Sequence, residues 1–429
     1  MSDIIMLNSI NASEATSPRA GSKRVDKVAF PDAPQPGSNR TPTTIPNVEH
    51  LLSAVGIKPQ YNEITKEMKL NGREGHALTA NDVTSIAVFN GLNQNLVLQY
   101  IPDIAQRNPC NPVRDWIQSV AWDGKDRLQD LYATVRVADE YPATLKNILL
   151  YRWLVSATAA ALKPQGFKAR GVLTLQGPQG CGKTSWIGAL VSNQGLRDTV
   201  VRLDHHLDAG NKDSIIGAIA NWITEIGELD SSFKRDIGKI KGFLTLDRDI
   251  LRRPYGRGEV EFQRRTVFAA TVNDYHFLLD PTGNNRWWTI AVESLNFKHD
   301  IDMQQLFAQL ALDFDAGVEW WLTPEEEKQL NAYNLQHRSV SVVKERILEA
   351  INLEALADAP RQAMTAIEVL TLSGINHPTN AQCKECGSVL RELFGPPRRI
   401  QGRDRWRVPL KATTGHDFNR KPPPPEDDF

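Results

Sequence analysis

Hydrophobic residues recur at helical spacing in the first half of the chain, from about residue 48 to residue 163. Leu51, Leu52 and Val55 follow this period, and so do Trp116 and Ile117 further along. Apolar positions three and four residues apart line one face of a helix, so we predict a mostly helical region. The longest apolar run, residues 148–162, contains an arginine and is shorter than the ~20 residues of a bilayer span. We interpret it as a buried helix.

The pattern changes after about residue 171. Short runs of β-branched and aromatic residues, at 171–176, 221–225 and 266–272, are separated by glycine-containing turns and helix-compatible segments. Continuous apolar runs of this length are typical of strands that are buried on both faces of a parallel sheet. We therefore predict an α/β domain over residues 166–335.

A third pattern begins after residue 339. Helical spacing covers residues 343–352, 365–372 and 380–393, and Ile400, Trp406 and Val408 then alternate with polar residues around Gly402. Three helices followed by a basic two-stranded hairpin predict a winged helix-turn-helix over residues 336–412, with residues 380–393 as the recognition helix. The alternative is a winged helix that serves only protein contacts or ring packing.

The two ends differ from these regions in composition. Residues 1–47 are rich in Ser, Thr, Asn, Ala and Pro, and residues 413–429 contain four consecutive prolines followed by acids. Such segments bury too little apolar surface to offset the entropy of ordering, so we predict a disordered arm and a disordered tail. Residues 48–165 then form a helical amino-terminal or collar domain.

Composition narrows the class of protein. The 429 residues are 41% hydrophobic and 24% charged, which is typical of globular domains. The formal net charge is −1, so any affinity for nucleic acid must come from a local basic surface. Four cysteines favour a reducing compartment, and the first ten residues lack the basic cluster of a secretory signal. We expect a soluble, cytoplasmic protein that does not associate with membranes.

Residues 177–184 match G-x-x-x-x-G-K-[ST] at every fixed position and lie between a predicted strand and a predicted helix. In such a phosphate-binding loop, glycines let backbone N–H groups face the phosphates, and the next helix adds its positive amino end. Lys183 supplies a charge, and the Thr184 hydroxyl supplies a Mg²⁺ ligand. We expect ATP and Mg²⁺ as cofactors, and the residues expected at the nucleotide are Gly177, Pro178, Gln179, Gly180, Cys181, Gly182, Lys183 and Thr184.

Polar residues at the ends of later strands suit the chemistry of hydrolysis. Glu225 is the first candidate to hold the Mg²⁺ or to polarise the attacking water, and Glu228 is the second. Asp230 equally suits the cap of the next helix. Asn273 is placed to orient the hydrolytic water. Arg286, on a loop, suits an arginine finger that reaches a neighbouring subunit's nucleotide, although a loop arginine on its own is usually only solvated.

The order of these motifs resembles the virulence-associated protein E family, which comprises phage and genomic-island ATPases related to superfamily 3 helicases and to viral and plasmid primase-helicases. The resemblance covers about residues 111–295. The motifs that carry it are the phosphate-binding loop, W-I-x-E-I-G-E-L-D at 222–230, Lys241, D-I-L-R-R-P-Y-G-R at 249–257, T-x-N at 271–273 and T-G-N-x-R-W at 282–287.

This resemblance implies an AAA+-like P-loop ATPase core. Glu225 and Glu228 would form its acidic motif, Asn273 its sensor and Arg286 its finger or second sensor. The family tends to show two adjacent arginines before the aromatic residue, whereas Asn285 precedes Arg286 here. Which contact the missing charge would make stays open.

Related helicases place a hairpin between the acidic strand and the sensor strand, pointing into the pore of a six-membered ring. The corresponding residues 248–264 are dense in arginine. Our hypothesis is that Arg253 and Arg257 grip the phosphates of single-stranded DNA without reading sequence, and that Arg252 joins them or faces a nucleotide or an acidic neighbour. The alternative is a surface hairpin with solvated arginines.

The carboxy-terminal hairpin carries five more arginines, which we expect to contact duplex DNA: Arg398, Arg399, Arg403, Arg405 and Arg407. Cys383 and Cys386 have metal-like spacing, but no second pair of ligands is evident, so we interpret both as helix residues.

These features predict a Mg²⁺-dependent ATPase that works as a helicase-like replication motor of a phage or mobile genetic element. We expect a homo-oligomeric ring, a hexamer, with single-stranded DNA in its pore and duplex DNA at the winged helix. The alternative is an ATP-controlled switch that binds DNA or recognises an origin without unwinding it; a small-molecule kinase would leave the basic hairpins without a use. No primase motif is visible before residue 165, so priming would come from a separate polypeptide.

Overall fold

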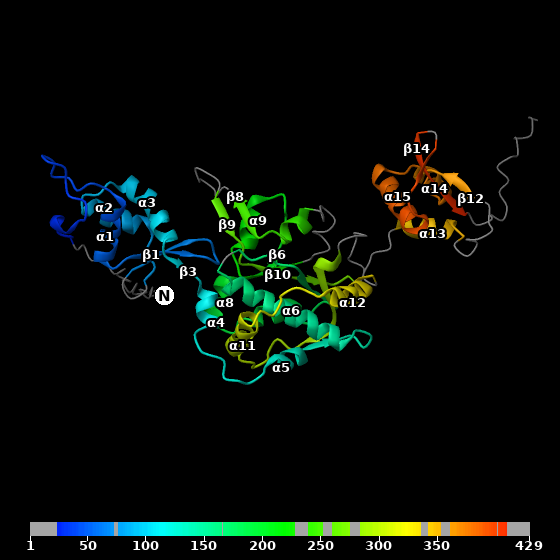
Figure 1. Cartoon of the computed structure of the whole chain (residues 1–429), viewed down its shortest axis with the longest axis horizontal. Helices are drawn as coiled ribbons and strands as arrows, with labels where there is room; N and C mark the ends of the chain where they lie inside the picture. The colour runs from blue at the N-terminus through cyan, green and yellow to red at the C-terminus, as the bar shows by residue number, and fades with distance from the viewer. Residues whose placement is uncertain are drawn as a thin grey trace, which may run out of the picture. The chain divides into compact units, whose positions relative to one another are not determined.

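The computed structural model describes residues 24–72, 76–164, 166–227, 239–251, 260–274, 284–335, 342–352, 361–400 and 402–409 (Figure 1). They form two compact units. The first contains the described residues up to 335, and the second contains residues 342–409.

The first unit begins with a small α/β part that has its own core. Phe30, Leu51, Val97 and Ile101 are among the residues buried there. A three-stranded sheet in the order β2-β1-β3 lies among the helices of this part. The elements are η1(Lys27–Ala29), α1(Ile45–Val55), β1(Lys58–Asn62), β2(Met68–Asn71), α2(Ala80–Phe89), α3(Gln94–Gln106) and β3(Pro109–Cys110).

The predicted disorder of residues 1–47 is wrong for residues 24–47, and residues 1–23 lie outside the described residues. Phe30 is buried in the core of this part. The buried Asn47 accepts a hydrogen bond from Asp32 N at 2.8 Å and donates to Asp32 O and Pro42 O at 3.0 and 2.8 Å. One aromatic anchor and one buried amide therefore order a segment whose average composition suggests a flexible chain.

A six-stranded sheet forms the centre of the first unit, in the order β4-β11-β5-β10-β7-β6. All neighbouring strands from β11 to β6 are parallel, and only the edge strand β4 is antiparallel. Every residue of β5, β7 and β10 is buried, as expected for strands with helices on both faces. The strands of this part are β4(Val135–Val137), β5(Val172–Gln176), β6(Val201–His205), β7(Ile223–Ile226), β8(Arg248–Leu251), β9(Val260–Gln263), β10(Val267–Val272) and β11(Trp287–Leu295).

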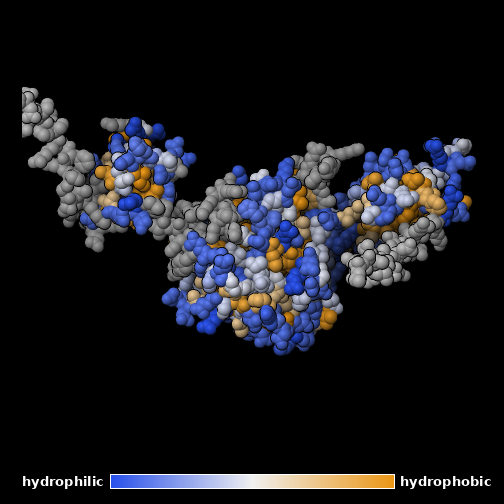
Figure 2. All heavy atoms as spheres, turned by 180° about the vertical axis from the view of Figure 1, so that it is seen from behind, coloured by the Kyte–Doolittle hydropathy of each residue, from blue (hydrophilic) through white to orange (hydrophobic). Residues whose placement is uncertain are grey.

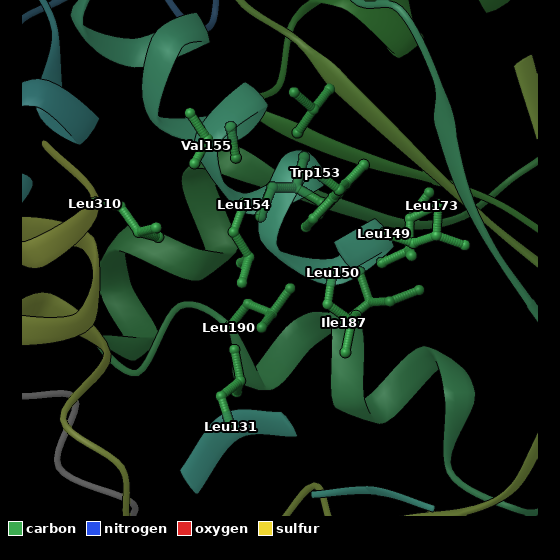
Figure 3. Packing of buried hydrophobic residues seen from close by; sticks show 14 of the residues in the cluster. Leu131, Leu149, Leu150, Trp153, Leu154, Val155, Leu173, Ile187, Leu190 and Leu310 are labelled. Carbon is green, nitrogen blue, oxygen red and sulfur yellow. The ribbon is translucent and has the colours of Figure 1, made fainter. Parts of the chain in front are cut away.

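The apolar run at residues 148–162 lies in the buried helix α6, which confirms its interpretation. Trp153 and Leu149 of α6 belong to the same core as Leu173 of β5, Ile187 of α7 and Leu310 of α11 (Figure 3). The helices are α4(Pro112–Ile117), α5(Leu128–Ala133), α6(Ala143–Leu162), α7(Lys183–Ala189), α8(Gln194–Val200), α9(Lys212–Ile219), η3(Asn284–Arg286), α11(Met303–Asp315) and α12(Pro324–Asn334).

Residues 48–165 are mostly helical, as predicted, and also contain the short strands β1, β2, β3 and β4. The boundary predicted at residue 165 differs from the structure, because it divides one core: α6 packs against the central sheet and β4 extends that sheet. Helical periodicity in the sequence shows which residues face inward, but it cannot show which core they enter.

The second unit has the order helix, strand, helix, helix, strand, strand. Trp406 and Val408 are buried against Ile347 and Leu390. Its sheet has the order β12-β14-β13, and the predicted two-stranded hairpin is confirmed as β13 and β14. The strand β12 was not predicted. The elements are α13(Val342–Ala350), β12(Arg361–Met364), α14(Ala366–Leu372), α15(Asn380–Phe394), β13(Arg398–Ile400) and β14(Arg403–Pro409).

The predicted α/β class is confirmed, with helices and mixed sheets throughout the described chain. The visible surface is mainly hydrophilic, with limited hydrophobic patches (Figure 2). Within the described ranges no helix combines the length and apolarity needed to cross a bilayer. The predicted tail, residues 413–429, lies outside the described residues.

Candidate functional site

The glycine-rich loop, residues 177–184, lies between β5 and α7, as the motif predicts. Gly180 and Gly182 have φ of 82° and 94°, which only glycine adopts without strain. A Cβ at Gly177 would lie 2.3 Å from the carbonyl oxygen of Val292, so β11 approaches the loop backbone closely. The loop glycines are therefore required both by conformation and by space.

Lys183 lies inside the curve of this loop and is buried. Its Nζ donates to Gly177 O and Pro178 O, both at 2.8 Å, and to Asn273 Oδ1 at 2.9 Å. Asn273 follows β10, which pairs with β5 so that Val272 is opposite Gln176. The structure thus brings the predicted lysine and the predicted amide together at one edge of the sheet.

Glu225 is fully buried in β7 and lies beside the same loop. Its Oε1 accepts hydrogen bonds from Thr184 Oγ1 at 2.8 Å and from Thr271 Oγ1 at 2.7 Å, and its Oε2 accepts from Asp204 N at 2.9 Å. Three donors on three different elements hold the carboxylate in place. The hydroxyl and carboxylate oxygens of Thr184 and Glu225 suit Mg²⁺, which prefers oxygen ligands.

Two of these neighbours were not predicted. Thr271 lies two residues before Asn273 on β10, and its contact with Glu225 depends on the pairing of β10 with β7. Asp204 lies near the end of β6 with a φ of 52°, a left-handed conformation that non-glycine residues rarely adopt. Its carboxylate packs against Gly227, where a Cβ would lie 2.0 Å from Asp204 Oδ1. The available signal for Asp204 was an acid that directly follows the short apolar run V-V-R-L at residues 200–203.

The end of β11 and the segment that follows it also contact the glycine-rich loop. Leu295 N donates to Cys181 O at 3.1 Å, and Phe297, which is 38% exposed, packs against Gly182. An open pocket of about 610 Å³ adjoins this segment and includes Thr134 and His299 in its lining. Burial lowers the pKa of His299, so this imidazole favours its neutral form.

Arg286 lies at the amino-terminal ends of the parallel strands, whereas the glycine-rich loop follows the carboxyl-terminal end of β5. Arg286 directly precedes β11, whose first residue Trp287 is opposite Val172, the first residue of β5. Strands rise ~3.3 Å per residue, so the length of β5 separates Arg286 from its own glycine-rich loop by roughly 16 Å. The structure therefore does not bring Arg286 together with Lys183, Glu225 and Asn273 within one chain, and its role as a finger or second sensor stays a prediction.

The arginine-rich stretch 248–264 contains the predicted hairpin, with β8 antiparallel to β9. The residues expected to touch DNA there, Arg252, Arg253 and Arg257, lie outside the described residues, as does Glu228. Arg264, at the end of this stretch, is fully buried and is therefore not available to DNA.

In the second unit, Arg398, Arg399, Arg403 and Arg407 are exposed on β13 and β14. Arg405 differs, because its Nη1 donates to Ala363 O at 2.9 Å and to Glu368 Oε2 at 3.2 Å. Arg405 therefore holds α14 against the sheet, and its expected contact with DNA stays a prediction.

A groove of about 780 Å³ lies between α15 and the β13–β14 hairpin. Lys384 and Arg391 of α15 line it together with Arg399 and Arg403 of the hairpin. Both α15 residues were missed, because helical residues outside the hairpin give no arginine cluster in the sequence. Cys383 and Cys386 are confirmed as helix residues, and burial raises the pKa of the Cys386 thiol to about 12. The described residues contain no cluster of three His, Cys, Asp or Glu side chains suited to a metal.

Together these features define a mixed α/β protein with a glycine-rich loop, a buried carboxylate and an amide at one edge of its sheet. The chain belongs to the family of virulence-associated protein E-like domains, whose family model matches residues 117–339, slightly more than half of the 429 residues. The resemblance inferred from the motifs is thereby confirmed.

Solved structures of the C-terminal region of NrS-1 in its apo state are similar to this chain. One shares 14% sequence identity with a TM-score of 0.39 and covers 85% of this chain and 98% of that chain. A structure of its A form shares 12% identity with a TM-score of 0.41 and covers 85% and 99%. No curated protein matches the sequence.

Proposed function

We propose that this protein is a Mg²⁺-dependent ATPase that acts on DNA as a ring-forming, helicase-like motor. The observation that carries the proposal is the pair of contacts Lys183–Asn273 and Thr184–Glu225, at 2.9 and 2.8 Å. These contacts unite a matched phosphate-loop motif with a buried carboxylate and an amide from two other strands. The strand order β5-β10-β7, in which β10 separates the loop strand from the carboxylate strand, supports an AAA+-like core.

Phosphate binding follows from the loop geometry. The curved backbone of residues 177–184 offers N–H groups to the phosphates, and the amino end of α7 adds its partial positive charge. The Lys183 ammonium, which donates to loop carbonyls and to Asn273 in this structure, would exchange some of these acceptors for phosphate oxygens. The pocket beside Thr134 and His299 has room for the nucleoside.

The metal site would use Thr184 directly and Glu225 directly or through water. Bound Mg²⁺ neutralises negative charge on the phosphates. Thr271 and Asp204 N hold the Glu225 carboxylate in its position. Asn273 would orient the hydrolytic water, and Glu228 stays the second candidate for the acid. Arg286 would act on the nucleotide of a neighbouring subunit.

Hydrolysis and binding can be separated by two substitutions in the full-length protein. Lys183→Ala should abolish nucleotide binding, and Glu225→Gln should preserve binding but lower kcat by about 100-fold or more, because the amide no longer supplies an anionic oxygen. Nucleotide affinity by fluorescence titration and phosphate release measure the two effects. Arg40→Ala, on an exposed residue outside the site, is the control. A wild-type protein that neither binds nor hydrolyses ATP refutes the proposal.

Duplex binding would fall to the second unit, which we propose is a winged helix. The order α13, β12, α14, α15, β13, β14 and the basic groove between α15 and the hairpin support this assignment. Phosphate contacts from Arg399 and Arg403 would position α15 on the duplex.

The basic groove equally supports the alternative, an ATP-controlled DNA-binding switch. A strand-displacement assay on a forked substrate distinguishes the two functions. ATP-dependent displacement supports the motor, whereas DNA-stimulated hydrolysis without displacement supports the switch. Electron microscopy with a non-hydrolysable nucleotide and DNA tests the expected hexameric ring.

A further inference from the structure

A pocket of about 410 Å³ opens at the amino-terminal ends of the parallel strands of the central sheet, away from the glycine-rich loop at their carboxyl-terminal ends. Three cationic residues, Lys168, Arg170 and Arg286, line it together with Trp288 and Trp321. Lys168 and Arg170 precede β5, and Arg286 precedes β11, so the three cations converge from two neighbouring parallel strands.

Among the described residues, the positive charge of this pocket is only partly balanced. Of the described residues that line it, Glu327 alone is acidic, and Asp247, which interacts with Lys168, already pairs with Arg248 at 3.4 Å. Among the described residues, no ion pair is formed by any of the three cations. Arg286 Nε is sealed from solvent and has no hydrogen-bond partner. A buried guanidinium N–H without an acceptor is costly, which indicates that an anion completes the site.

Two tryptophan side chains pack against the backbone and the cations of this pocket. Trp288 is 2% exposed, and a Cβ at Gly171 would lie 2.0 Å from Trp288 Cε2, so the backbone between Arg170 and β5 fits tightly against this ring. The Arg170 guanidinium lies 5.9 Å from the centre of the Trp321 ring, within the range of a cation–π interaction. Lys168 and Arg170 are exposed to solvent, and the backbone that carries them packs tightly against Trp288.

The anion cannot be the nucleotide of the same chain, because the length of β5 separates the pocket from the chain's own loop. A second copy that places its loop against this edge would supply the missing anion through a head-to-tail contact, which closes into a ring when the rotation permits. Guanidinium groups bind phosphate in a bidentate manner, and a lysine adds a compact charge.

We propose that Lys168 and Arg170 bind, together with Arg286, the terminal phosphate of the nucleotide held by a second copy of this chain. The inference rests on the proposed ATPase function and extends the single finger Arg286 to a cluster of three cations. Lys168 and Arg170 stand at one end of β5 and the glycine-rich loop stands at its other end. Each β5 therefore links the nucleotide of a neighbouring copy to the nucleotide of its own chain.

The test uses the full-length protein and a subunit-mixing experiment. Arg170→Ala and Lys168→Ala should each lower ATP turnover by about 10-fold or more, because removing charge stabilisation from the transition state lowers kcat. Both side chains are exposed, so the folded state should be retained, and thermal unfolding verifies this. Arg40→Ala is the matched control and should keep wild-type turnover.

Mixing Arg170→Ala with Lys183→Ala should restore part of the lost activity. In the mixture, an intact glycine-rich loop of the first variant meets an intact pocket of the second. Loss of turnover without recovery on mixing would mean that the pocket acts only within its own chain, which overturns the inference.

The remaining outcomes also decide the question. Unchanged turnover in Arg170→Ala, with an active wild type, refutes the inference and leaves the ATPase proposal standing. An inactive wild type refutes the ATPase proposal, and the inference fails with it. Weaker binding of single-stranded DNA without recovery on mixing would assign the pocket to the DNA backbone instead of a nucleotide.

Discussion

At the base of the β8–β9 hairpin, Arg264 and Arg265 are buried, whereas Arg398, Arg399 and Arg403 of the β13–β14 hairpin are exposed. Both hairpins are rich in arginine and both follow helical segments. Their arginines nevertheless differ in burial and in the partners they contact. Arg264 and Arg265, at the base of the first hairpin, hold the fold together, whereas the exposed arginines of the second hairpin remain available to an anionic partner.

Partners within the chain explain the burial at the first hairpin. Arg264 Nε donates to Asp249 Oδ2 at 3.0 Å, and its guanidinium stacks on Phe243 at 4.3 Å. Arg265 donates to the carbonyl oxygens of Lys163 and Pro164 and pairs with Glu63 at 3.4 Å. Each buried cation therefore has several acceptors, which offset its loss of hydration.

The second hairpin has few such acceptors. Trp406 and Val408 of β14 face the core, so Arg403 and Arg407 on the opposite side of this strand face solvent. Among the described residues of this hairpin, Arg405 alone forms an ion pair, with Glu368 at 3.2 Å. The comparison shows that an arginine becomes structural where a carboxylate and carbonyl groups lie within its reach, whatever the density of arginine around it.

The largest expected effect is on stability. Arg264→Ala should lower the free energy of unfolding by about 3–5 kcal/mol, because it leaves the Asp249 carboxylate buried without its partner. Arg399→Ala, on an exposed residue, should change it by less than about 0.5 kcal/mol. Denaturant unfolding of both variants measures the difference, and similar values would remove the distinction between the hairpins.

The next effect is on the pH dependence of stability and concerns Lys66. Its Nζ donates a hydrogen bond to Gln263 O, in the first hairpin, at 2.7 Å. Burial lowers its pKa to about 7, with Arg265 and Arg264 adding to the shift and Glu63 and Asp249 opposing it. In the unfolded chain the pKa is near 10.5. The unfolded state therefore binds more protons between these values, and stability rises with pH over this range.

The substitution Lys66→Met removes the titrating amine and so tests whether Lys66 causes this pH dependence of stability. The wild type should gain on the order of 2 kcal/mol relative to Lys66→Met between pH 7 and pH 9, as followed by urea unfolding at several pH values. Parallel stability profiles for the two proteins would show that Lys66 keeps an ordinary pKa at this contact.

The smallest expected effect is on DNA binding by the second hairpin. Arg399→Ala and Arg403→Ala should each weaken duplex affinity by about 1 kcal/mol and lower the salt slope by roughly 0.9, since each removes one phosphate contact. Arg405→Ala is the control within the same strand, because its guanidinium is held by Glu368. Equal losses for Arg403 and Arg405 would contradict the assignment of free and structural arginines.

Much of the site could be predicted because its signals are local. The glycines of residues 177–184 are required by their own backbone angles and by one close contact. The strands β5, β7 and β10 are apolar runs because both of their faces are buried. Lys183, Thr184, Glu225 and Asn273 then meet because parallel strands end at one edge of a sheet, a rule that needs only the correct strands.

What the sequence alone determined about this protein is therefore the family, the α/β class and the edge of the sheet that carries the candidate chemistry. Only the tertiary structure decided that residues 24–47 are ordered, that Asp204 and Thr271 contact Glu225, and that Arg286 lies at the amino-terminal ends of the parallel strands, away from the glycine-rich loop. These outcomes depend on pairings between distant segments, and a pattern along the chain does not specify which distant partner a buried or charged side chain will meet.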